Sequence, residues 1–169
     1  RGRHAKVLSE QGLKTLGIDL SQESIEFARQ YEHKHLRFKV GNMLEELPFG
    51  SVDWVMNLFT SFGYFENDNL HELALKNMAN TLKPQGRLVI DFMNSGKIAG
   101  NLIPENIVQT DIATYEITRK EEKGYIVKNI QVKHGNSILN FEERVRAFTA
   151  DDFKKMLDKA KLEIIEIAG

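Results

Sequence analysis

Short apolar runs alternate with stretches of helical periodicity over the first half of the chain. Four of these runs predict strands that end in a polar or glycine-containing turn, at residues 15–18, 36–40, 52–56 and 87–92. Apolar residues recur at helical spacing from Leu70 to Leu82, and residues 83–86 predict a turn before the last run. Strands separated by helices and short loops favour right-handed crossovers and a parallel sheet with helices on both faces. The pattern therefore predicts an α/β fold.

The pattern changes after Asn94. Residues 94–106 contain glycines and a proline and predict a loop. Three extended segments follow with no helical spacing between them, at residues 107–119, 125–133 and 138–148. The glycine-containing segments 122–124 and 134–136 are typical of hairpin turns. These features predict an antiparallel β insertion at about 107–148, over or beside the parallel sheet.

No internal repeat, low-complexity tract or linker interrupts the sequence, so we expect a single domain over residues 1–169. A last helix should begin at Thr149, which has capping-box spacing to Asp152. The chain begins at Arg1 without an initiator methionine and ends soon after a strand-like run at 162–167. We expect both ends to be truncated, with a strand and a glycine loop before the first residue and an antiparallel strand after the last.

Composition narrows the class of protein. The chain has 169 residues, with 23 Lys and Arg against 24 Asp and Glu, a formal net charge of -1 and no cysteine. The lack of cysteine excludes disulfides, thiolate metal ligands and a cysteine nucleophile. The balanced charge disfavours a nucleic-acid surface or a polybasic membrane anchor. No apolar run approaches the roughly 20 residues of a membrane helix, and no signal peptide begins the chain, so we expect a soluble, cytoplasmic protein.

Polar side chains follow the carboxyl ends of the predicted strands, where open parallel sheets bind their ligands. They are Asp19, Asn42, Asn57 and Asp91. A carboxylate at a strand end can accept hydrogen bonds from both hydroxyls of a ribose, so Asp19 is the strongest candidate for a nucleoside contact. The alternative is that Asp19 helps Ser21 to cap the next helix. Asn42 and Asp91 also have structural alternatives. The amide of Asn42 can bond the backbone of its own turn, and Asp91 can form a hydrogen bond at the sheet edge.

Several short motifs occur in a fixed order, at residues 2–5, 17–21, 41–43, 47–49, 52–55 and 82–90. In this order and spacing, the chain resembles a class I S-adenosylmethionine-dependent methyltransferase of the small-molecule type. Residues 59–64 and the antiparallel insertion are similar to the branch that contains glycine-type and amino-sugar N-methyltransferases. The resemblance spans essentially the whole chain. It implies a Rossmann-like, mostly parallel sheet and S-adenosylmethionine as the cofactor.

The resemblance also implies roles for individual residues of a cofactor site. Gly2 would be the last glycine of the glycine-rich loop, and Asp19 would hold the ribose. The other implied cofactor contacts are His4 in the first helical turn, Leu20 beside the adenine, Asn42 at the adenine amino group, Met43 over the ring, and Asn57 and Leu58 beside the methionine portion. Gln85 departs from the family pattern, which more often has glycine after Pro84.

The loop after Asn57 is rich in aromatic side chains and is the predicted substrate surface. Its candidate substrate residues are Phe59, Phe62 and Tyr64. A sulfonium and a substrate amine both favour aromatic faces over bulk water. Aromatic residues at a strand end also pack beneath helices, so we expect about half of these rings, counted with Phe65, to do so. Arg144 and Arg146 can bind a substrate carboxylate or phosphate, or can be ordinary solvated strand residues.

The implied reaction is methyl transfer to a small-molecule acceptor by in-line displacement, in which the protein positions the reactants and excludes water. No residue is assigned as catalytic, although His71, Tyr64 and His4 are the nearest candidates for a base. Asn57 stands where a metal-dependent enzyme would need a carboxylate, so no metal is expected. Two alternatives stay open, an NAD-dependent oxidoreductase and a non-catalytic methyltransferase-like scaffold. A homodimer also stays open.

Overall fold

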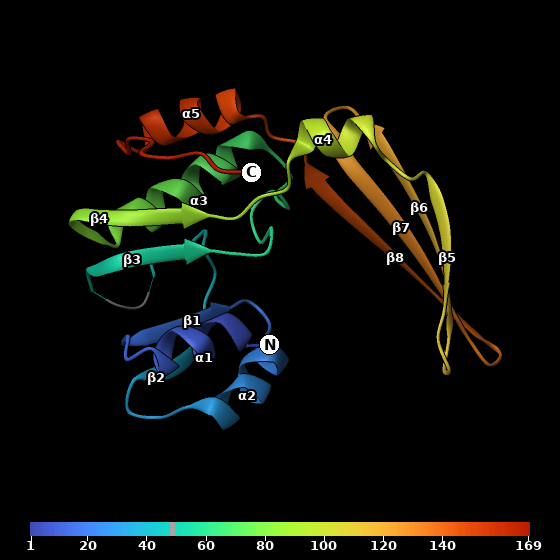
Figure 1. Cartoon of the computed structure of the whole chain (residues 1–169), viewed down its shortest axis with the longest axis horizontal. Helices are drawn as coiled ribbons and strands as arrows, with labels where there is room; N and C mark the ends of the chain where they lie inside the picture. The colour runs from blue at the N-terminus through green and yellow to red at the C-terminus, as the bar shows by residue number, and fades with distance from the viewer. Residues whose placement is uncertain (48–49) are drawn as a thin grey trace. The chain divides into compact units, whose positions relative to one another are not determined.

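The computed structural model describes the whole chain except Pro48 and Phe49, which end one of the sequence motifs (Figure 1). The described residues fall into two compact units, Arg1–Ser51 and Val52–Gly169, and each unit is described by itself. The single domain expected from the sequence stays a prediction.

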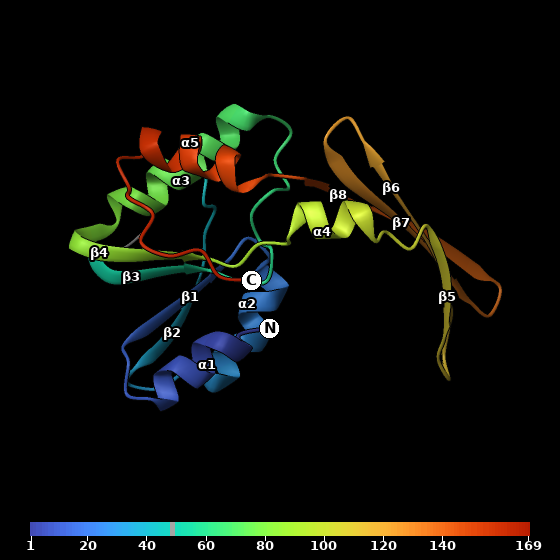
Figure 2. The same ribbon diagram turned by 45° about the horizontal axis from the view of Figure 1, so that its top comes forward.

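The unit Arg1–Ser51 is built on two parallel strands and the helices that precede and follow the first of them (Figure 2). Its elements are α1 (Arg3–Glu10), β1 (Thr15–Asp19), α2 (Gln22–Ala28), the 3-10 helix η1 (Arg29–Tyr31) and β2 (Leu36–Val40). The two strands pair in register, so that Asp19 lies opposite Val40 at their carboxyl ends. Ser21 caps α2 by accepting a hydrogen bond from the backbone N–H of Ser24.

The ring of Phe38 holds this small unit together. It belongs to a buried apolar cluster made of Ile25, Ala28, Leu36 and Phe38. A Cβ atom on Gly17 would lie 2.5 Å from ring atoms of Phe38, and one on Gly2 would lie 2.9 Å from the ring. Gly2 also has a φ of 76°, in the left-handed region that favours glycine. Both positions require glycine, because the ring closes directly on the backbone.

The unit Val52–Gly169 begins with a second parallel pair, β3 (Val52–Asn57) and β4 (Leu82–Ile90). Helix α3 (Asp68–Asn80) connects them, and α5 (Ala150–Lys159) lies beside α3 (Figure 2).

The capping box expected for α5 is confirmed. The hydroxyl of Thr149 accepts from the N–H of Asp152 at 3.2 Å, and the carboxylate of Asp152 accepts from the N–H of Thr149 at 3.0 Å.

The turn predicted at residues 83–86 is wrong in its placement, because these residues belong to β4. The register between β3 and β4 shifts between Val52 and Trp54, and pairing resumes beyond the shift. The extra residues belong to β4, between Leu82 and Arg87. Gln85 is one of them and has a φ of 65°. A bulge adds residues to one strand without ending the ladder, and its sequence looks like that of a turn.

Aromatic side chains form the core of this unit. Phe62, in the loop after β3, is fully buried. The centroid of its ring lies 5.1 Å from that of His71 on α3, and 5.8 Å from those of Phe148 and Phe153 near α5. These contacts attach the loop after β3 to both helices.

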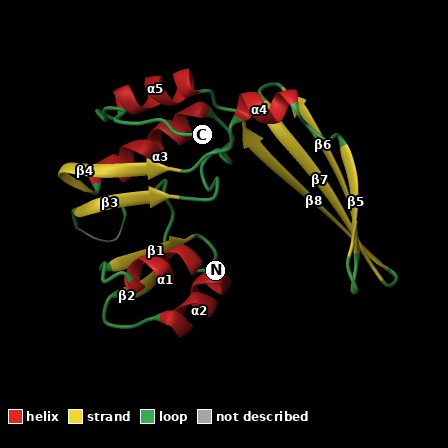
Figure 3. Ribbon diagram, viewed as in Figure 1, coloured by secondary structure: helices red, strands yellow, loops and turns green. Residues whose placement is uncertain are grey.

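A four-stranded antiparallel sheet follows β4 (Figure 3). Its strands run in the order β5 (Glu105–Gln109), β6 (Thr114–Glu122), β7 (Tyr125–His134) and β8 (Ser137–Arg146). The predicted antiparallel insertion is confirmed, and tight turns follow β6 and β7 where the glycines predict them. With its parallel pairs and this sheet, the chain has the expected α/β fold, although the parallel strands form two pairs rather than one continuous sheet in the described residues.

Two sequence predictions in this region are wrong. Residues 94–106 contain the short helix α4 (Ser95–Gly100), which Asn94 caps by accepting from the N–H of Lys97 at 3.0 Å. The extended segment 107–119 is divided between β5 and β6 by a turn closed at Thr110, whose N–H donates to the carbonyl of residue 113 at 2.9 Å. Side-chain capping and a polar turn without glycine give weak signals in a hydrophobicity pattern.

The strand predicted at residues 162–167 is also wrong, because the segment joins no sheet in the part of the chain that the structure describes. A strand requires a neighbouring strand to bond its backbone, and this segment pairs with none of the described strands. Ile165 and Ile167 are exposed.

We expect Gly17→Ala to destabilise the protein by about 1–3 kcal/mol, because the new methyl group would overlap the ring of Phe38. Chemical denaturation measures the change. Gly50→Ala is the control, since nothing lies within 4 Å of a Cβ atom there. Equal effects of the two substitutions would contradict the packing described for Phe38.

Candidate functional site

The carboxyl ends of β1 and β2 bring two of the predicted cofactor residues together. Asp19 is the last residue of β1, and its backbone carbonyl accepts from the N–H of Gly41 at 3.1 Å. Asn42 follows directly, at the start of the loop after β2. The parallel register therefore places both side chains at the same edge of the sheet, as expected.

Each of these two side chains also stabilises its own turn. The carboxylate Oδ1 of Asp19 accepts from the N–H of Ser21 at 2.8 Å, and Oδ1 of Asn42 accepts from the N–H of Leu44 at 3.0 Å. The structural roles considered as alternatives are thus present. A carboxylate has two acceptor oxygens and an amide has two donor hydrogens, so these bonds leave capacity for a ligand. Asp19 is exposed and Asn42 is half-buried.

Gly2 and two apolar side chains complete the candidate cofactor site in this unit. Gly2 is the N-cap of α1, and its missing side chain leaves the backbone close to Phe38. Leu20 is exposed directly beyond β1, and Met43 is half-buried beyond β2. His4 lies in the first turn of α1 and is exposed.

The carboxyl ends of β3 and β4 form a second group of polar contacts. The N–H of Asp91 donates to the carbonyl of Asn57 at 2.8 Å, which extends the ladder by one residue. Asn57 is buried, and Leu58 is half-buried. The carboxylate Oδ2 of Asp91 accepts from the N–H of Phe59 at 2.9 Å, and its carbonyl accepts from the N–H of Thr60 at 3.1 Å. The structural alternative considered for Asp91, a hydrogen-bonding group at the sheet edge, is thus present.

The aromatic loop divides evenly between packing and exposure, as expected. Phe62 is fully buried, and Phe65 packs beside it with ring centroids 6.4 Å apart. Phe59 is 72% exposed and Tyr64 is 51% exposed. Partial burial, and then the negative charge of Glu143 on β8, raise the pKa of the Tyr64 hydroxyl. This tyrosine is therefore a hydrogen-bond donor rather than a base at neutral pH.

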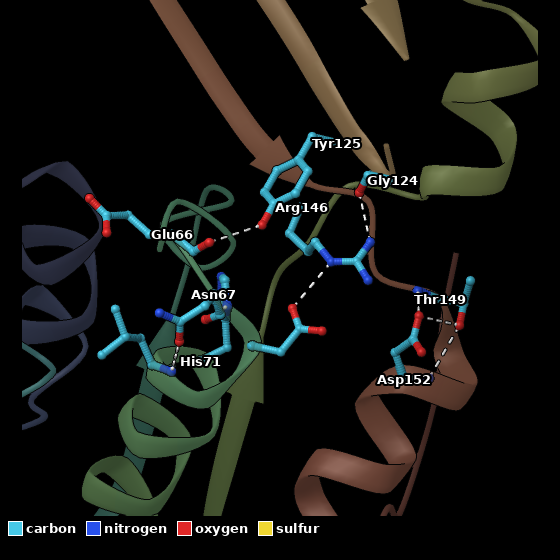
Figure 4. A network of polar contacts seen from close by, with 10 residues as sticks. Glu66, Asn67, His71, Gly124, Tyr125, Arg146, Thr149 and Asp152 are labelled. Carbon is cyan, nitrogen blue, oxygen red and sulfur yellow. Dashed lines mark hydrogen bonds and ion pairs between the residues drawn. The ribbon is translucent and has the colours of Figure 1, made fainter. Parts of the chain in front are cut away.

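His71 is a buried residue of the aromatic core, and Figure 4 shows its polar contact with Asn67. Its Nδ1 lies 2.9 Å from the carbonyl of Asn67, and because a carbonyl only accepts, Nδ1 carries the proton. Burial lowers the pKa of His71, against smaller opposing effects from the carbonyl of Asn67 and the charge of Asp68. His71 is one of the three candidate bases, but it is fully buried and has no exposed surface that could contact an acceptor.

The two arginines of β8 have different environments, and Figure 4 shows that of Arg146. Arg146 donates to the carbonyl of Gly124 at 2.7 Å and pairs with the carboxylate of Asp68 at 3.2 Å. Arg144 is exposed, with its guanidinium 4.3 Å from the centre of the Tyr125 ring. Sequence analysis missed Tyr125, although the hairpin turn sets the register that places it opposite Arg146.

Neither a metal site nor a membrane helix is found in the described part of the chain. No three His, Asp or Glu side chains gather there as a metal ion would require. No described helix has both the length and the apolar character needed to cross a bilayer.

The predicted site residues thus form two groups. The unit Arg1–Ser51 holds Gly2, His4, Asp19, Leu20, Asn42 and Met43. The unit Val52–Gly169 holds Asn57, Leu58, Phe59, Phe62, Tyr64, Arg144 and Arg146. The convergence of both groups on one nucleoside stays a prediction.

Comparison with known proteins identifies the family. Residues 1–86 match the family model described as methyltransferase domain. The chain belongs to this methyltransferase family.

Individual relatives agree with this assignment. The YqeM protein of Bacillus subtilis is described as a methyltransferase. It is 27% identical over 96% of this chain and 70% of its own length. The S-adenosylmethionine-dependent methyltransferase of Clostridium acetobutylicum superimposes with a TM-score of 0.78 at 20% identity, over 90% of this chain and 65% of that one. The sugar N-methyltransferase KedS8 of a Streptoalloteichus species has a TM-score of 0.73 at 20% identity, over 94% of this chain and 67% of its own. The chain thus spans about two thirds of the length of these relatives.

We expect the free energy of unfolding to fall as the pH drops below 6.5, the usual pKa of histidine, because the unfolded chain then binds a proton that folded His71 does not. Protonation of His71 in the unfolded chain lowers the free energy of unfolding by up to about 1.4 kcal/mol for each pH unit, until the pH falls below the lowered pKa of the folded state. Denaturation of the wild type and of His71→Asn between pH 5 and 8 measures it. The stability difference between the two should be constant above about pH 7.5 and should narrow below 6.5. A difference that does not change with pH would contradict the lowered pKa.

Proposed function

We propose that the protein transfers a methyl group from S-adenosylmethionine to a small-molecule acceptor of the sugar or amino-sugar class. The observation that carries the proposal is the edge formed by β1 and β2. There a carboxylate (Asp19) and an amide (Asn42) lie side by side at the ends of parallel strands, in the unit whose helix α1 begins at Gly2.

The residues of this edge fit an adenosine group. Asp19 would bind the ribose hydroxyls, and Asn42 would bind the adenine amino group. Leu20 and Met43 supply apolar surface for the base, while the missing side chain of Gly2 allows close approach to the backbone before α1. When bound, S-adenosylmethionine supplies a methyl group on a positively charged sulfur, which needs no further activation.

The acceptor would contact the second unit. Phe59 and Tyr64 are the exposed aromatic side chains of the loop after β3, and the raised pKa of Tyr64 keeps its hydroxyl protonated for donation to an acceptor oxygen or nitrogen. Arg144 is held over the Tyr125 ring and suits a carboxylate or phosphate on the acceptor. Arg146 is already bound to Asp68 and Gly124, so Arg144 is the better candidate of the two.

The similarity to a sugar N-methyltransferase supports an acceptor of this size and chemistry. An amine that arrives neutral needs no general base, which agrees with the burial of His71 and the raised pKa of Tyr64. The contribution of the chain would then be orientation of the acceptor and exclusion of water.

We expect calorimetric titration to show binding of S-adenosylmethionine and no binding of NAD. Asp19→Ala should weaken S-adenosylmethionine binding at least tenfold, or about 1.4 kcal/mol, because the ribose would lose its bidentate acceptor.

Ser21→Ala is the matched control. It removes the cap of α2 but keeps the carboxylate of Asp19, so its affinity should stay close to that of the wild type. Equal losses in the two variants would mean that Asp19 acts only through the helix. Binding of NAD alone would support an oxidoreductase, and binding of neither nucleotide a non-catalytic scaffold.

A further inference from the structure

We propose that Tyr125 is a positioning residue, whose ring holds the guanidinium of Arg144 in place to bind a phosphate group. The inference rests on the proposed function, because it chooses between the two acceptor groups that Arg144 suits there. All of the contacts that carry it lie within the unit Val52–Gly169.

The ring of Tyr125 is fixed at the start of β7. Tyr125 lies opposite Glu122 on β6 and opposite Arg146 on β8, so the three side chains share one face of the sheet. Its hydroxyl donates to the backbone carbonyl of Glu66 at 3.4 Å (Figure 4). Tyr125 is thus attached both to the antiparallel sheet and to the loop before α3.

Arg146 supports this ring but is occupied by other contacts. Its guanidinium lies 5.5 Å from the centre of the Tyr125 ring, and it also binds the carbonyl of Gly124 and the carboxylate of Asp68. Two of its N–H groups are therefore used within the fold, and its charge is paired.

Arg144 lies over the same ring with its donors uncommitted. Its guanidinium carbon is 4.3 Å from the ring centre, close enough for a cation–π contact. Arg144 is exposed, and among the described residues it has no hydrogen-bond or ion-pair partner. A guanidinium presents several N–H donors in one plane and suits an oxyanion. Because the ring already restricts this side chain, Arg144 would lose less freedom when a ligand binds.

Further positive charge gathers around Arg144. Lys120 lies in the same row across the sheet, since Lys120 and Arg144 both pair with Val127. Lys120 also forms an ion pair with the carboxylate of Glu122. Lys120, and then Arg144 and Lys123, lower the pKa of the Glu122 carboxyl. Three cations therefore lie near one carboxylate.

This charge favours one of the two candidate groups. A carboxylate carries a single negative charge, whereas a phosphate group carries about −1.5 to −2 at neutral pH. The three cations outnumber the carboxylate that they share, so a more highly charged anion is attracted more strongly. The site therefore fits a phosphate group better than a carboxylate.

The test is the affinity of the protein for inorganic phosphate, measured by calorimetric titration at constant ionic strength. Arg144→Gln should weaken binding at least tenfold, because the phosphate loses its charged hydrogen bonds. Arg144 is exposed, so this substitution leaves the core intact.

Two substitutions separate the ring of Tyr125 from its hydroxyl. Tyr125→Leu should weaken phosphate binding about threefold, the effect of losing one exposed cation–π contact. Tyr125→Phe keeps the ring and should bind phosphate like the wild type. Tyr125→Leu should cause no further loss in the Arg144→Gln variant, because Tyr125 acts through Arg144. Equal losses in Tyr125→Phe and Tyr125→Leu would overturn the positioning role of the ring.

Arg119→Gln is the matched control. Arg119 lies opposite Lys128, on the other face of the sheet from Arg144, and it donates to the side chain of Asn106. The variant removes the same charge from the same sheet and should leave the affinity for phosphate unchanged. Equal losses in Arg119→Gln and Arg144→Gln would indicate a nonspecific effect of charge, which would overturn the inference.

A hexose phosphate distinguishes the source of the phosphate group. Tighter binding than that of inorganic phosphate would support a phosphate carried by the acceptor. Equal affinities would overturn that assignment and support a site for free phosphate. A wild type that binds S-adenosylmethionine but no phosphate would overturn the inference and leave the proposed function intact. One that binds phosphate but not S-adenosylmethionine would overturn the proposed function and leave the phosphate site.

Discussion

Parallel pairing of short strands is the constraint on which the candidate site depends. Two strands that run side by side in the same direction must end at the same edge, and the residues after them are then neighbours whatever their distance in sequence. This is how Asp19 comes to lie beside Asn42, and Asp91 beside Phe59. In both pairs a backbone hydrogen bond at the strand end joins the two loops, so the side chains start from fixed positions.

Polar residues at these strand ends have structural roles, and the proposed site would use two of the same side chains, Asp19 and Asn42. The Asp19 carboxylate closes the turn into α2, the Asn42 amide closes the turn after β2, and Asp91 holds two left-handed residues. A side chain fixed in this way loses little further freedom when a ligand binds, which lowers the entropic cost of recognition. A structural role for such a residue therefore does not argue against a functional one.

Features encoded by local spacing could be predicted from the sequence. The strands before Asp19 and Asn42, the capping box at Thr149 and the glycine turns of the antiparallel sheet depend on neighbouring residues and were found. Features that depend on the pairing of strands could not be predicted from the sequence. The bulge around Gln85 resembles a turn until the partner strand is known, and a strand-like run at 162–167 is no strand without a neighbour. The burial of His71 also escaped prediction, because it arises from rings on distant segments.

Arg146 lies where the antiparallel sheet meets the rest of its unit. Its N–H donates to the carbonyl of Gly63 in the loop after β3, and its guanidinium binds both the first turn of α3 and the β6–β7 turn. The sheet is thus anchored at one end, while the opposite ends of its strands carry exposed side chains such as Leu139 and Phe141. Because the sheet is held at the end near Arg146, substitutions at the opposite end should not disturb the loop that carries Phe59 and Tyr64. The contacts of Arg146 with Asp68 and Gly124 therefore do not depend on the sequence at the far ends of the strands.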